Sequence, residues 1–283
     1  MTAPHRLRCA ETWAGSEGTS SAADLPGLRV WVHSTPSGSS EAGGDVHYVS
    51  VCPSCIVSRI ALADVSGHGR AVAMLGVKLL ELMQKYLTAL EQTSLMRDLN
   101  EAVMTELDGV HYATMVAVGF HRRRGLLVMT NAGHPPALWY RANRGEWSWF
   151  EPRLAQTRPG VSGTPLGLLA DASYDRMIVK PEPDDLIVLY SDGVSEATNP
   201  AGTELGRDEL MTLARTLDPR SAETFGTQLL EAVTAFRGGR APEDDETIIV
   251  LQRTSEQSTD WNWNRNESLL CRLGANLLDT DVV

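Results

Sequence analysis

The spacing of apolar and polar residues predicts a series of β-strands along most of the chain. Residues 28–33 alternate between apolar and polar side chains, as a strand with one buried face does. Further strands are predicted at 46–51, 57–64, 112–121, 125–130, 137–140, 147–150 and 174–179. Leu186–Tyr190 is apolar throughout, which indicates a strand buried on both faces. A last, β-branched strand is predicted at 247–251.

Four segments between these strands have the period of helices. The first is predicted to run from Gly69 to about residue 90, and the others cover 95–107, 207–216 and 221–237. The apolar face of the first helix consists of Leu75, Leu79, Leu82 and Tyr86, which we interpret as core. Because the helices are grouped and do not alternate strictly with strands, we predict an α+β fold built on antiparallel sheets.

Composition divides the chain into three parts. Residues 1–27 are rich in Ser, Gly, Ala and Thr and predict a flexible leader, so the folded domain is expected at 28–254. Residues 34–44 and 151–163 predict loops, the second a flap over the domain. Residues 255–283 form a tail whose Trp261, Trp263 and apolar segment 268–278 are expected to pack on the domain or on a partner.

Charge and hydropathy exclude two classes of partner. The chain has 25 Lys and Arg against 36 Asp and Glu, a net charge of −11, which on average repels nucleic acid. No apolar run approaches the ~18 residues that span a bilayer, and residues 1–10 lack the apolar stretch of a signal peptide. We therefore expect a cytoplasmic protein with no nucleic-acid or membrane partner.

The four cysteines, at positions 9, 52, 55 and 271, are too few and too scattered to predict a disulfide framework, which fits a reducing compartment. Cys52 and Cys55 form a Cys-x-x-Cys pair with two interpretations. They are either half of a zinc site or a redox pair, with His47 as the nearest further ligand, or a plain turn between strands. The absence of a second such pair favours the turn.

Four aspartates share a context that indicates metal binding. Asp45, Asp64, Asp192 and Asp244 each stand at the edge of a predicted strand, three of them beside glycine-containing turns. Carboxylates at neighbouring strand ends can point into one pocket, where they repel one another unless a cation neutralises them. Oxygen ligands without a His or Cys cluster favour Mg²⁺ or Mn²⁺. Two such ions ~4 Å apart hold a hydroxide for attack on a phosphoryl group.

Five motifs in order resemble the metal-dependent protein phosphatase (PPM) family, and more narrowly its bacterial SpoIIE-like branch. The motifs are Gly43-Gly44-Asp45, Asp64-Val65-Ser66-Gly67-His68-Gly69, Asn131-Ala132-Gly133-His134-Pro135-Pro136, Ser191-Asp192-Gly193-Val194 and Asp244-Asp245-Glu246-Thr247. The resemblance extends from about residue 28 to 251. It implies a sandwich of two antiparallel sheets flanked by helices, with two Mn²⁺ or Mg²⁺ ions that serve removal of phosphate from Ser or Thr.

The resemblance also implies a role for each ligand. Asp64 would bridge both ions, and the backbone carbonyl of Val65 would bind one of them. Asp192 and Asp244 would bind the other ion, with Asp45 a ligand directly or through water. Since a carbonyl is the ligand at position 65, the side chain there is free to be apolar.

Two histidines lie in these motifs. His68 is a candidate proton donor to the leaving serine oxygen, because imidazole suits that task near neutral pH. Its alternative role is to bind backbone and shape the loop. His134, before two prolines, is interpreted as a structural residue that packs and hydrogen-bonds at a strand start.

Family likeness implies a phosphorylated protein partner, and in this branch often a small anti-sigma-factor antagonist of the STAS fold. Regulation would come from a separate protein, a homodimer contact or the tail. Two alternative functions remain: a catalytically silent phosphatase fold that binds a signalling partner, and a metal hydrolase of small phosphoesters. A serine hydrolase is disfavoured because the chain has no G-x-S-x-G motif.

Overall fold

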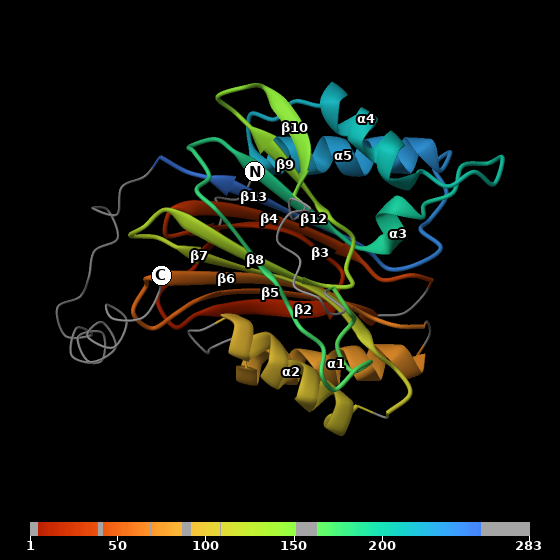
Figure 1. The fold of residues 1–283 in the computed structure, drawn as a ribbon. Coiled ribbons are helices and arrows are strands. Elements are labelled where there is room, and N and C mark those ends of the chain that lie inside the picture. Colours follow the sequence, from red (N-terminus) through yellow and green to blue (C-terminus); the bar gives the residue numbers. More distant parts are fainter. Residues whose placement is uncertain are drawn as a thin grey trace.

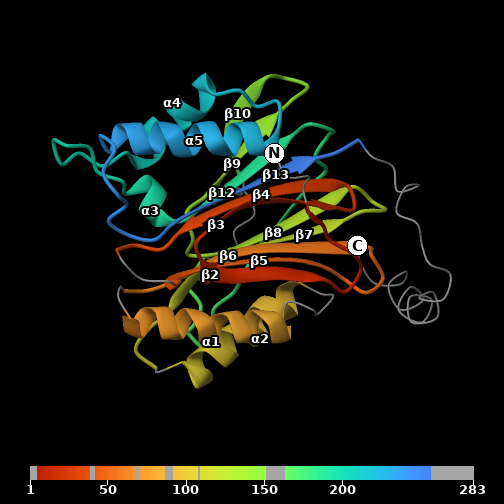
Figure 2. The same cartoon turned by 180° about the vertical axis from the view of Figure 1, so that it is seen from behind.

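Two β-sheets lie face to face, and helices cover the outer face of each (Figure 1). The computed structural model describes residues 5–38, 42–67, 70–86, 92–107, 109–150 and 163–255. Seen from behind, the same four layers follow one another: helices, sheet, sheet, helices (Figure 2). The predicted sandwich of two sheets flanked by helices is confirmed.

One sheet has seven strands and the other has six. The seven-stranded sheet has the order β1 (His5–Arg6), β3 (Thr19–Leu25), β4 (Leu28–Thr35), β13 (Glu246–Arg253), β12 (Leu186–Tyr190), β9 (Ala137–Arg141) and β10 (Glu146–Phe150). The six-stranded sheet has the order β11 (Arg176–Val179), β8 (Leu126–Ala132), β7 (Ala113–His121), β6 (Val57–Val65), β5 (Ala42–Val51) and β2 (Thr12–Glu17). All neighbouring strands are antiparallel except β1 and β3, which are parallel.

Five helices lie outside the sheets. Helices α1 (Arg70–Tyr86) and α2 (Gln92–Glu106) cover the six-stranded sheet. Helices α4 (Gly206–Thr216) and α5 (Ala222–Phe236) cover the seven-stranded sheet, and the single turn α3 (Asp192–Ser195) follows β12. The predicted helices are therefore confirmed within a few residues, whereas α3 was not predicted because one turn carries no periodic signal.

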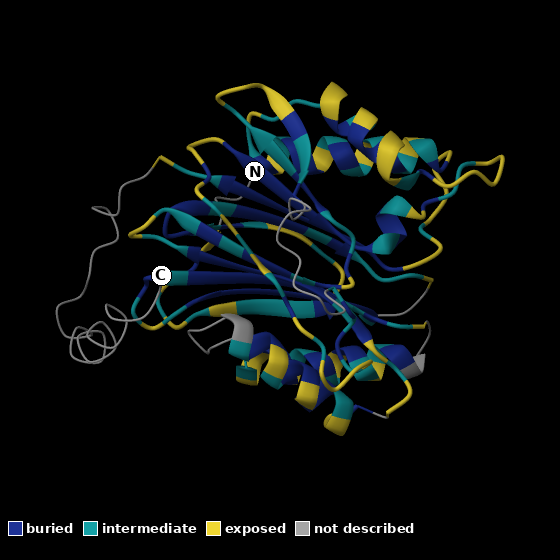
Figure 3. Cartoon of the chain, in the orientation of Figure 1, coloured by how far each residue is buried: buried dark blue, intermediate teal, exposed yellow. Residues whose placement is uncertain are grey.

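The core consists of three apolar layers, and most strand residues are buried (Figure 3). The middle layer fills the space between the sheets and includes Ile60 and Leu62 of β6, which face Ile249 and Leu251 of β13 within one cluster. The two outer layers lie between each sheet and its helices. Because side chains alternate along a strand, residues at every second position of β6 point towards the opposite sheet.

The prediction of a flexible leader over 1–27 was wrong for most of that segment. Strand β2 pairs with β5, and β3 pairs with β4 along its whole length. Small residues such as Ala23 are buried at a sheet edge, where a neighbouring strand supplies the hydrogen bonds that the segment cannot make alone. Composition rich in Ser and Gly was therefore a poor guide, because half-exposed edge strands tolerate it.

Residues 42–44, at the end of a predicted loop, belong to β5. Ala42 pairs with Glu17 of β2, and Asp45 pairs with Asp64 of β6. Glycine weakens a strand taken by itself, so the pattern indicated a loop. Pairing on both sides overcomes that local preference.

Within the described ranges Cys9 and Cys55 form a disulfide, with 5.1 Å between their Cα atoms. The sequence analysis predicted no disulfide framework, because the cysteines are few and scattered, and it did not predict this bridge between cysteines 46 positions apart. Cys52 is free, and the N–H of Cys55 donates to its carbonyl at 2.8 Å. The Cys52–Cys55 segment is thus the predicted turn, and His47 lies about 16 Å along the strand from Cys52.

The cytoplasmic location and the predictions for His68, the flap and the tail remain predictions. No helix in the described ranges is long and apolar enough to cross a membrane, and the cytoplasmic location stays a prediction. His68, the flap residues 151–162 and the tail residues 256–283, with Trp261 and Trp263, lie outside the described residues.

His134 has the structural role that its motif predicted. The side chain of Asn131 accepts from the N–H of His134 and donates to its carbonyl, both at 2.8 Å, which closes the turn between β8 and β9. The ring bonds to the hydroxyl of Thr114 through Nδ1 at 2.9 Å. Thr114 pairs with Asp64, so His134 supports the strand next to a predicted ligand. Burial lowers the pKa of His134 to about 3.

A buried ion pair ties α5 to the start of β13. Arg237 and Glu246 are 4% and 1% exposed, and their side chains form two hydrogen bonds, one of them 3.4 Å between Nη2 and Oε1. Glu246 comes directly after Asp244 and Asp245 in the chain. The pair therefore anchors the segment that carries a predicted ligand.

We expect His134 to make the folded protein acid-sensitive. The unfolded chain protonates this ring below pH ~6.5, whereas the folded protein does so only near pH 3, so stability falls as pH drops through that window. At pH 5 the loss from this group is about 2 kcal/mol. Denaturant unfolding of His134→Asn at pH 7 and pH 5 should show a smaller pH dependence by that amount. His5→Asn, at a side chain that is 68% exposed, should leave the dependence unchanged.

Replacing Arg237 with Met should destabilise the protein by about 3–5 kcal/mol, because Glu246 is left buried without a counter-charge. Unfolding in urea measures the loss, and adding Glu246→Gln to the same variant should restore part of it. Arg220→Met is the matched control: that Arg is 82% exposed in its pair with Asp218, so the effect should stay within about 1 kcal/mol. Equal losses in the two single variants would contradict the interpretation.

Candidate metal centre

The four predicted aspartates are supplied by both sheets. Asp45 is near the start of β5 and Asp64 near the end of β6, in the six-stranded sheet. Asp192 follows β12, and Asp244 precedes β13, in the seven-stranded sheet. Since β12 and β13 are antiparallel, the end of one adjoins the start of the other. The chain thus places one pair of acids on each sheet.

Asp45 and Asp64 are direct partners across two antiparallel strands. Side chains in that arrangement have Cβ atoms about 5 Å apart. Asp45 is 2% exposed, and neither oxygen of its carboxylate has a partner in good hydrogen-bond geometry among the described residues, although the side chains of Thr247 and Ser191 are near enough to lower its pKa in part. Burial, followed by the charge of Asp64, raises the pKa of Asp45 well above its usual range. A buried carboxylate without a partner is costly unless a cation accompanies it.

The charges of the two sheets act on each other. Burial, together with the charges of Asp192 and Asp244, raises the pKa of Asp64 to about 8. Burial and the charge of Asp244 likewise raise the pKa of Asp192. Asp64 is therefore close to both acids of the opposite sheet as well as to Asp45. The four predicted aspartates thus lie within reach of one another's charges.

The donor set of carboxylates suits a hard cation in its chemistry, although its side chains do not converge on one point in the described residues. In the ranges that the structure describes, no three Asp, Glu, His or Cys side chains are near enough to share one ion. Like charges repel without a cation, and the unpartnered oxygens of Asp45 provide free ligand positions. An all-oxygen set suits Mg²⁺ or Mn²⁺. This geometry also gives no support to the zinc interpretation of Cys52 and His47.

Val65 can offer only its backbone to this site. Its side chain is fully buried in the layer between the six-stranded sheet and the helices α1 and α2. Its carbonyl oxygen faces Gly44: a Cβ atom at position 44 would lie 3.2 Å from it. The carbonyl role that the family resemblance implies for Val65 stays a prediction.

Glycines allow helix α1 to approach the strand that carries Asp45. A Cβ atom at Gly44 would lie 2.8 Å from Cγ1 of Val72, and one at Gly76 would lie 2.8 Å from the carbonyl oxygen of Gly43. Both contacts are closer than real Cβ atoms tolerate. The start of β5 is thus held between α1 and the neighbouring strands.

The hydroxyl of Ser191 connects the two segments that carry Asp192 and Asp244. The N–H of Thr247 donates to Oγ of Ser191 at 2.9 Å, and this hydroxyl donates to the carbonyl of Asp245 at 3.2 Å. Ser191 also donates its own N–H to the carbonyl of Thr247 at 3.0 Å. Because Ser191 precedes Asp192, these bonds fix the end of β12 beside the segment that carries Asp244.

Two further acids belong to this neighbourhood and were not assigned from the sequence. Glu196 donates its N–H to the carbonyl of Asp192 at 2.7 Å, and its charge contributes to the raised pKa of Asp64. A spacing of four residues from Asp192 could have indicated it, since such residues share a helix face. Asp245 is buried, and nothing in the acidic run 243–246 distinguishes it from Asp244 by sequence alone.

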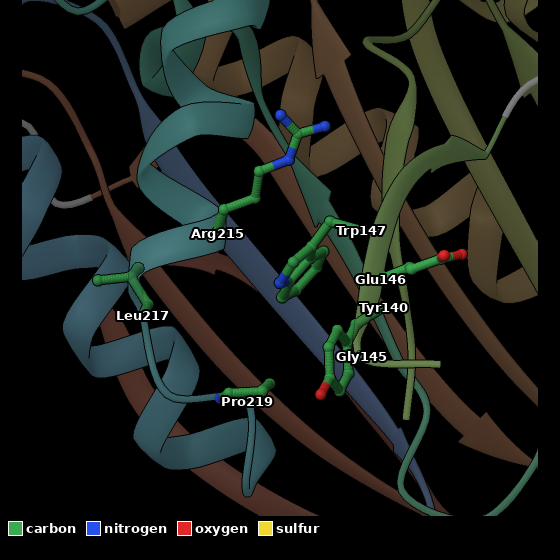
Figure 4. A pocket seen from close by; sticks show the side chains of 7 residues that line it. All are labelled: Tyr140, Gly145, Glu146, Trp147, Arg215, Leu217 and Pro219. Atoms are coloured by element: carbon green, nitrogen blue, oxygen red, sulfur yellow. The ribbon is translucent and has the colours of Figure 1, made fainter. Parts of the chain in front are cut away.

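A cleft of about 550 Å³ lies elsewhere, between the β9–β10 hairpin and the end of α4 (Figure 4). Trp147 lies between Arg215 on one side and Tyr140 on the other, and Leu217 and Pro219 complete the wall. None of the four aspartates lines it. The cleft is therefore separate from the acidic site.

The chain is similar to two curated proteins of Bacillus subtilis. It is 26% identical over 195 residues to the phosphoserine phosphatase RsbU, a match covering 69% of this chain and 55% of RsbU. It is 28% identical over 176 residues to the phosphoserine phosphatase RsbP, covering 60% and 41% respectively. The chain thus spans about half the length of the curated relatives it matches.

Solved structures match the fold. The RsbU and RsbW domains of Rv1364c from Mycobacterium tuberculosis align with a TM-score of 0.67 and 20% identity, covering 89% of this chain and 69% of that one. The catalytic domain of the serine/threonine protein phosphatase PstP, solved in complex with two manganese ions, aligns with a TM-score of 0.56 and 17% identity, covering 81% and 99%. At these identities the likeness shows the fold alone.

A family match covers the strands and turns that supply most of the acids. The family described as Stage II sporulation protein E (SpoIIE) matches residues 58–254, more than half of the chain, including Asp64, Asp192 and Asp244. Sequence similarity and fold point the same way: this chain belongs to the SpoIIE family and has the fold of the PPM protein phosphatases.

Proposed function

We propose that this chain is a metal-dependent phosphatase that removes phosphate from serine or threonine of a partner protein. The observation that supports this most is the buried, unpartnered carboxylate of Asp45 opposite Asp64, with Asp192 and Asp244 beside them. Such a set of carboxylates is unfavourable without cations and favourable with them. The names of the two curated relatives as phosphoserine phosphatases support the same reaction.

In this proposal two Mn²⁺ or Mg²⁺ ions are held by oxygen ligands from both sheets. The ligands are Asp45, Asp64, the carbonyl of Val65, Asp192 and Asp244. When bound, such ions lower the pKa of water and neutralise the phosphoryl oxygens. Asp64 would help to hold both ions, because it is the cross-strand partner of Asp45 and lies within reach of the charges of Asp192 and Asp244.

The protein itself contributes orientation and charge. Asp45 and Asp64 are held in register by strand pairing, and Ser191 holds the segments on the opposite side. Without cations this negative group would repel a phosphorylated side chain, so substrate binding depends on metal binding. His68, outside the described residues, is our candidate for the proton donor to the serine oxygen.

We further propose that the substrate is a phosphorylated STAS-domain protein, an anti-sigma-factor antagonist. Resemblance to the SpoIIE-like branch supports this, as does the likeness to RsbU and RsbP. The reaction itself requires only a phosphoserine that reaches the acidic end of the sandwich.

Asp64→Asn and Asp192→Asn should each lower turnover by more than 100-fold, because each removes a charged ligand. Purified protein is assayed with Mn²⁺ on an aryl phosphate and on a phosphorylated STAS-domain protein. Asp171→Asn, at an exposed aspartate away from the site, is the matched control and should keep full activity. Chelator should abolish turnover in the unaltered protein.

Thermal unfolding of the metal-free variants should show no loss of stability, since either substitution relieves repulsion between like charges. Full activity in either variant would overturn the mechanism. Turnover of small phosphoesters without any of phosphoproteins would indicate a metabolite hydrolase. A failure to bind Mn²⁺ in calorimetry would favour a catalytically silent partner-binding protein.

His68→Asn separates the two roles of that histidine. A proton donor matters for a serine leaving group and little for p-nitrophenolate, which leaves without protonation. We therefore expect kcat on phosphoserine substrate to fall by about 10²–10⁴-fold, with a much smaller change on p-nitrophenyl phosphate. Equal losses on both substrates would assign His68 to loop structure instead.

A further inference from the structure

Asp245 is buried beside the metal centre and uses its carboxylate on backbone groups. Its side chain accepts three N–H groups: Oδ1 from Ser37 at 2.6 Å, and Oδ2 from Gly44 at 2.5 Å and Asp45 at 3.4 Å. The residue is 9% exposed. Charge-assisted bonds of this kind are roughly twice as strong as neutral ones.

These three bonds join the two sheets at the site. Asp245 immediately precedes β13 of the seven-stranded sheet, whereas Gly44 and Asp45 lie in β5 of the six-stranded sheet. The partners are about two hundred residues apart in sequence. The carboxylate thus holds the strand start that carries Asp45 against the segment that carries Asp244.

The backbone of Asp245 is also engaged with the opposite ligands. Its N–H donates to Oδ1 of Asp244 at 2.8 Å, and its carbonyl accepts from Oγ of Ser191, the residue before Asp192. One residue therefore touches the carboxylate of Asp244, the backbone of Asp45 and the residue adjoining Asp192.

The neighbouring glycines leave room for this contact. A Cβ atom at Gly43 would overlap the Asp245 carboxylate, and one at Gly193 would overlap its carbonyl oxygen. Gly43 does not have a positive φ, so an alanine there is excluded by space and not by backbone conformation. Gly43 and Gly193, both in the sequence motifs, are therefore explained in the same way: a side chain at either position would overlap Asp245.

Both carboxylate oxygens are needed for this arrangement. An asparagine has one acceptor oxygen, and its NH₂ group would face an N–H of the backbone. The negative charge is unfavourable here, since it adds to the charges of Asp45, Asp64 and Asp192. A carboxylate at this position is therefore explained by its charge-assisted bonds to the backbone, which offset its repulsion from the neighbouring acids.

We propose that Asp245 is a positioning residue that sets the spacing between the Asp45–Asp64 pair and the Asp192–Asp244 pair. The inference rests on the proposed function, because the spacing matters only if the four carboxylates share cations. Asp245 is not itself assigned as a ligand, as its oxygens are occupied by N–H groups.

Three variants test the proposal. Asp245→Ala should weaken Mn²⁺ binding at least ten-fold in calorimetry and lower kcat with little change in KM. Asp245→Asn keeps one acceptor and should fall between Asp245→Ala and the unaltered protein. Glu243→Gln removes the same charge two residues away, at a side chain that is 71% exposed, and should stay within two-fold.

Gly43→Ala tests the same contact by placing a methyl group where the Asp245 carboxylate lies. It should weaken Mn²⁺ binding at least ten-fold by displacing the carboxylate, yet have less than a two-fold effect in the Asp245→Ala background, where the space is open. Such non-additivity marks two residues acting through one contact. Additive effects would overturn the proposal, and so would Mn²⁺ binding by Asp245→Ala that equals that of the unaltered protein.

Hydrogen exchange of the metal-free protein gives a measurement that does not depend on metal. The amides of Gly44 and Asp45 should exchange at least ten-fold faster in Asp245→Ala and Asp245→Asn, while the β12–β13 amides keep their protection and show that the fold is intact. Unchanged exchange would overturn the proposal. Slow exchange in an unaltered protein that binds no Mn²⁺ would instead overturn the proposed function and leave the contact standing.

Discussion

Repulsion between carboxylates is the constraint on which this structure depends. Asp45 and Asp64 are cross-strand partners, and the charges of Asp192 and Asp244 reach Asp64 from the other sheet. Bringing four like charges together opposes folding, and only a rigid framework or bound cations can offset it. The protein provides the framework from two sheets with packed apolar faces.

The period of the strands explains how the framework ends in a polar site. Ile60, Leu62 and Asp64 occupy alternate positions of β6, so all three point towards the opposite sheet. Ile249 lies four residues after Asp245, so its side chain has the same orientation in the strand pattern, and it also lies in the middle layer. The apolar layer between the sheets thus passes directly into the acidic cluster at one end of the sandwich. The packing of the core therefore sets the positions of the proposed ligands.

Close backbone approach is the second requirement. Gly44 lets α1 contact the ligand strand, and Gly43 and Gly193 admit Asp245 from the other side. The sequence motifs Gly-Gly-Asp and Asp-Gly therefore combine a ligand with the space that its support needs. The buried pair of Arg237 and Glu246 secures the same segment from the direction of α5. The positions of the proposed ligands therefore depend on these contacts.

The sequence by itself predicted the helices, most strands and an antiparallel α+β fold, and it singled out the four aspartates, because periodicity and local motifs are short-range properties. The sandwich of two sheets was implied by the resemblance to the PPM family. Only the tertiary structure decided that residues 12–25 are strands, that Cys9 meets Cys55, and that Asp245 supports the site. Each of these depends on a partner distant in the chain. Edge strands need a neighbour, a disulfide needs proximity, and a side chain bonded to backbone two hundred residues away leaves no trace in a local pattern.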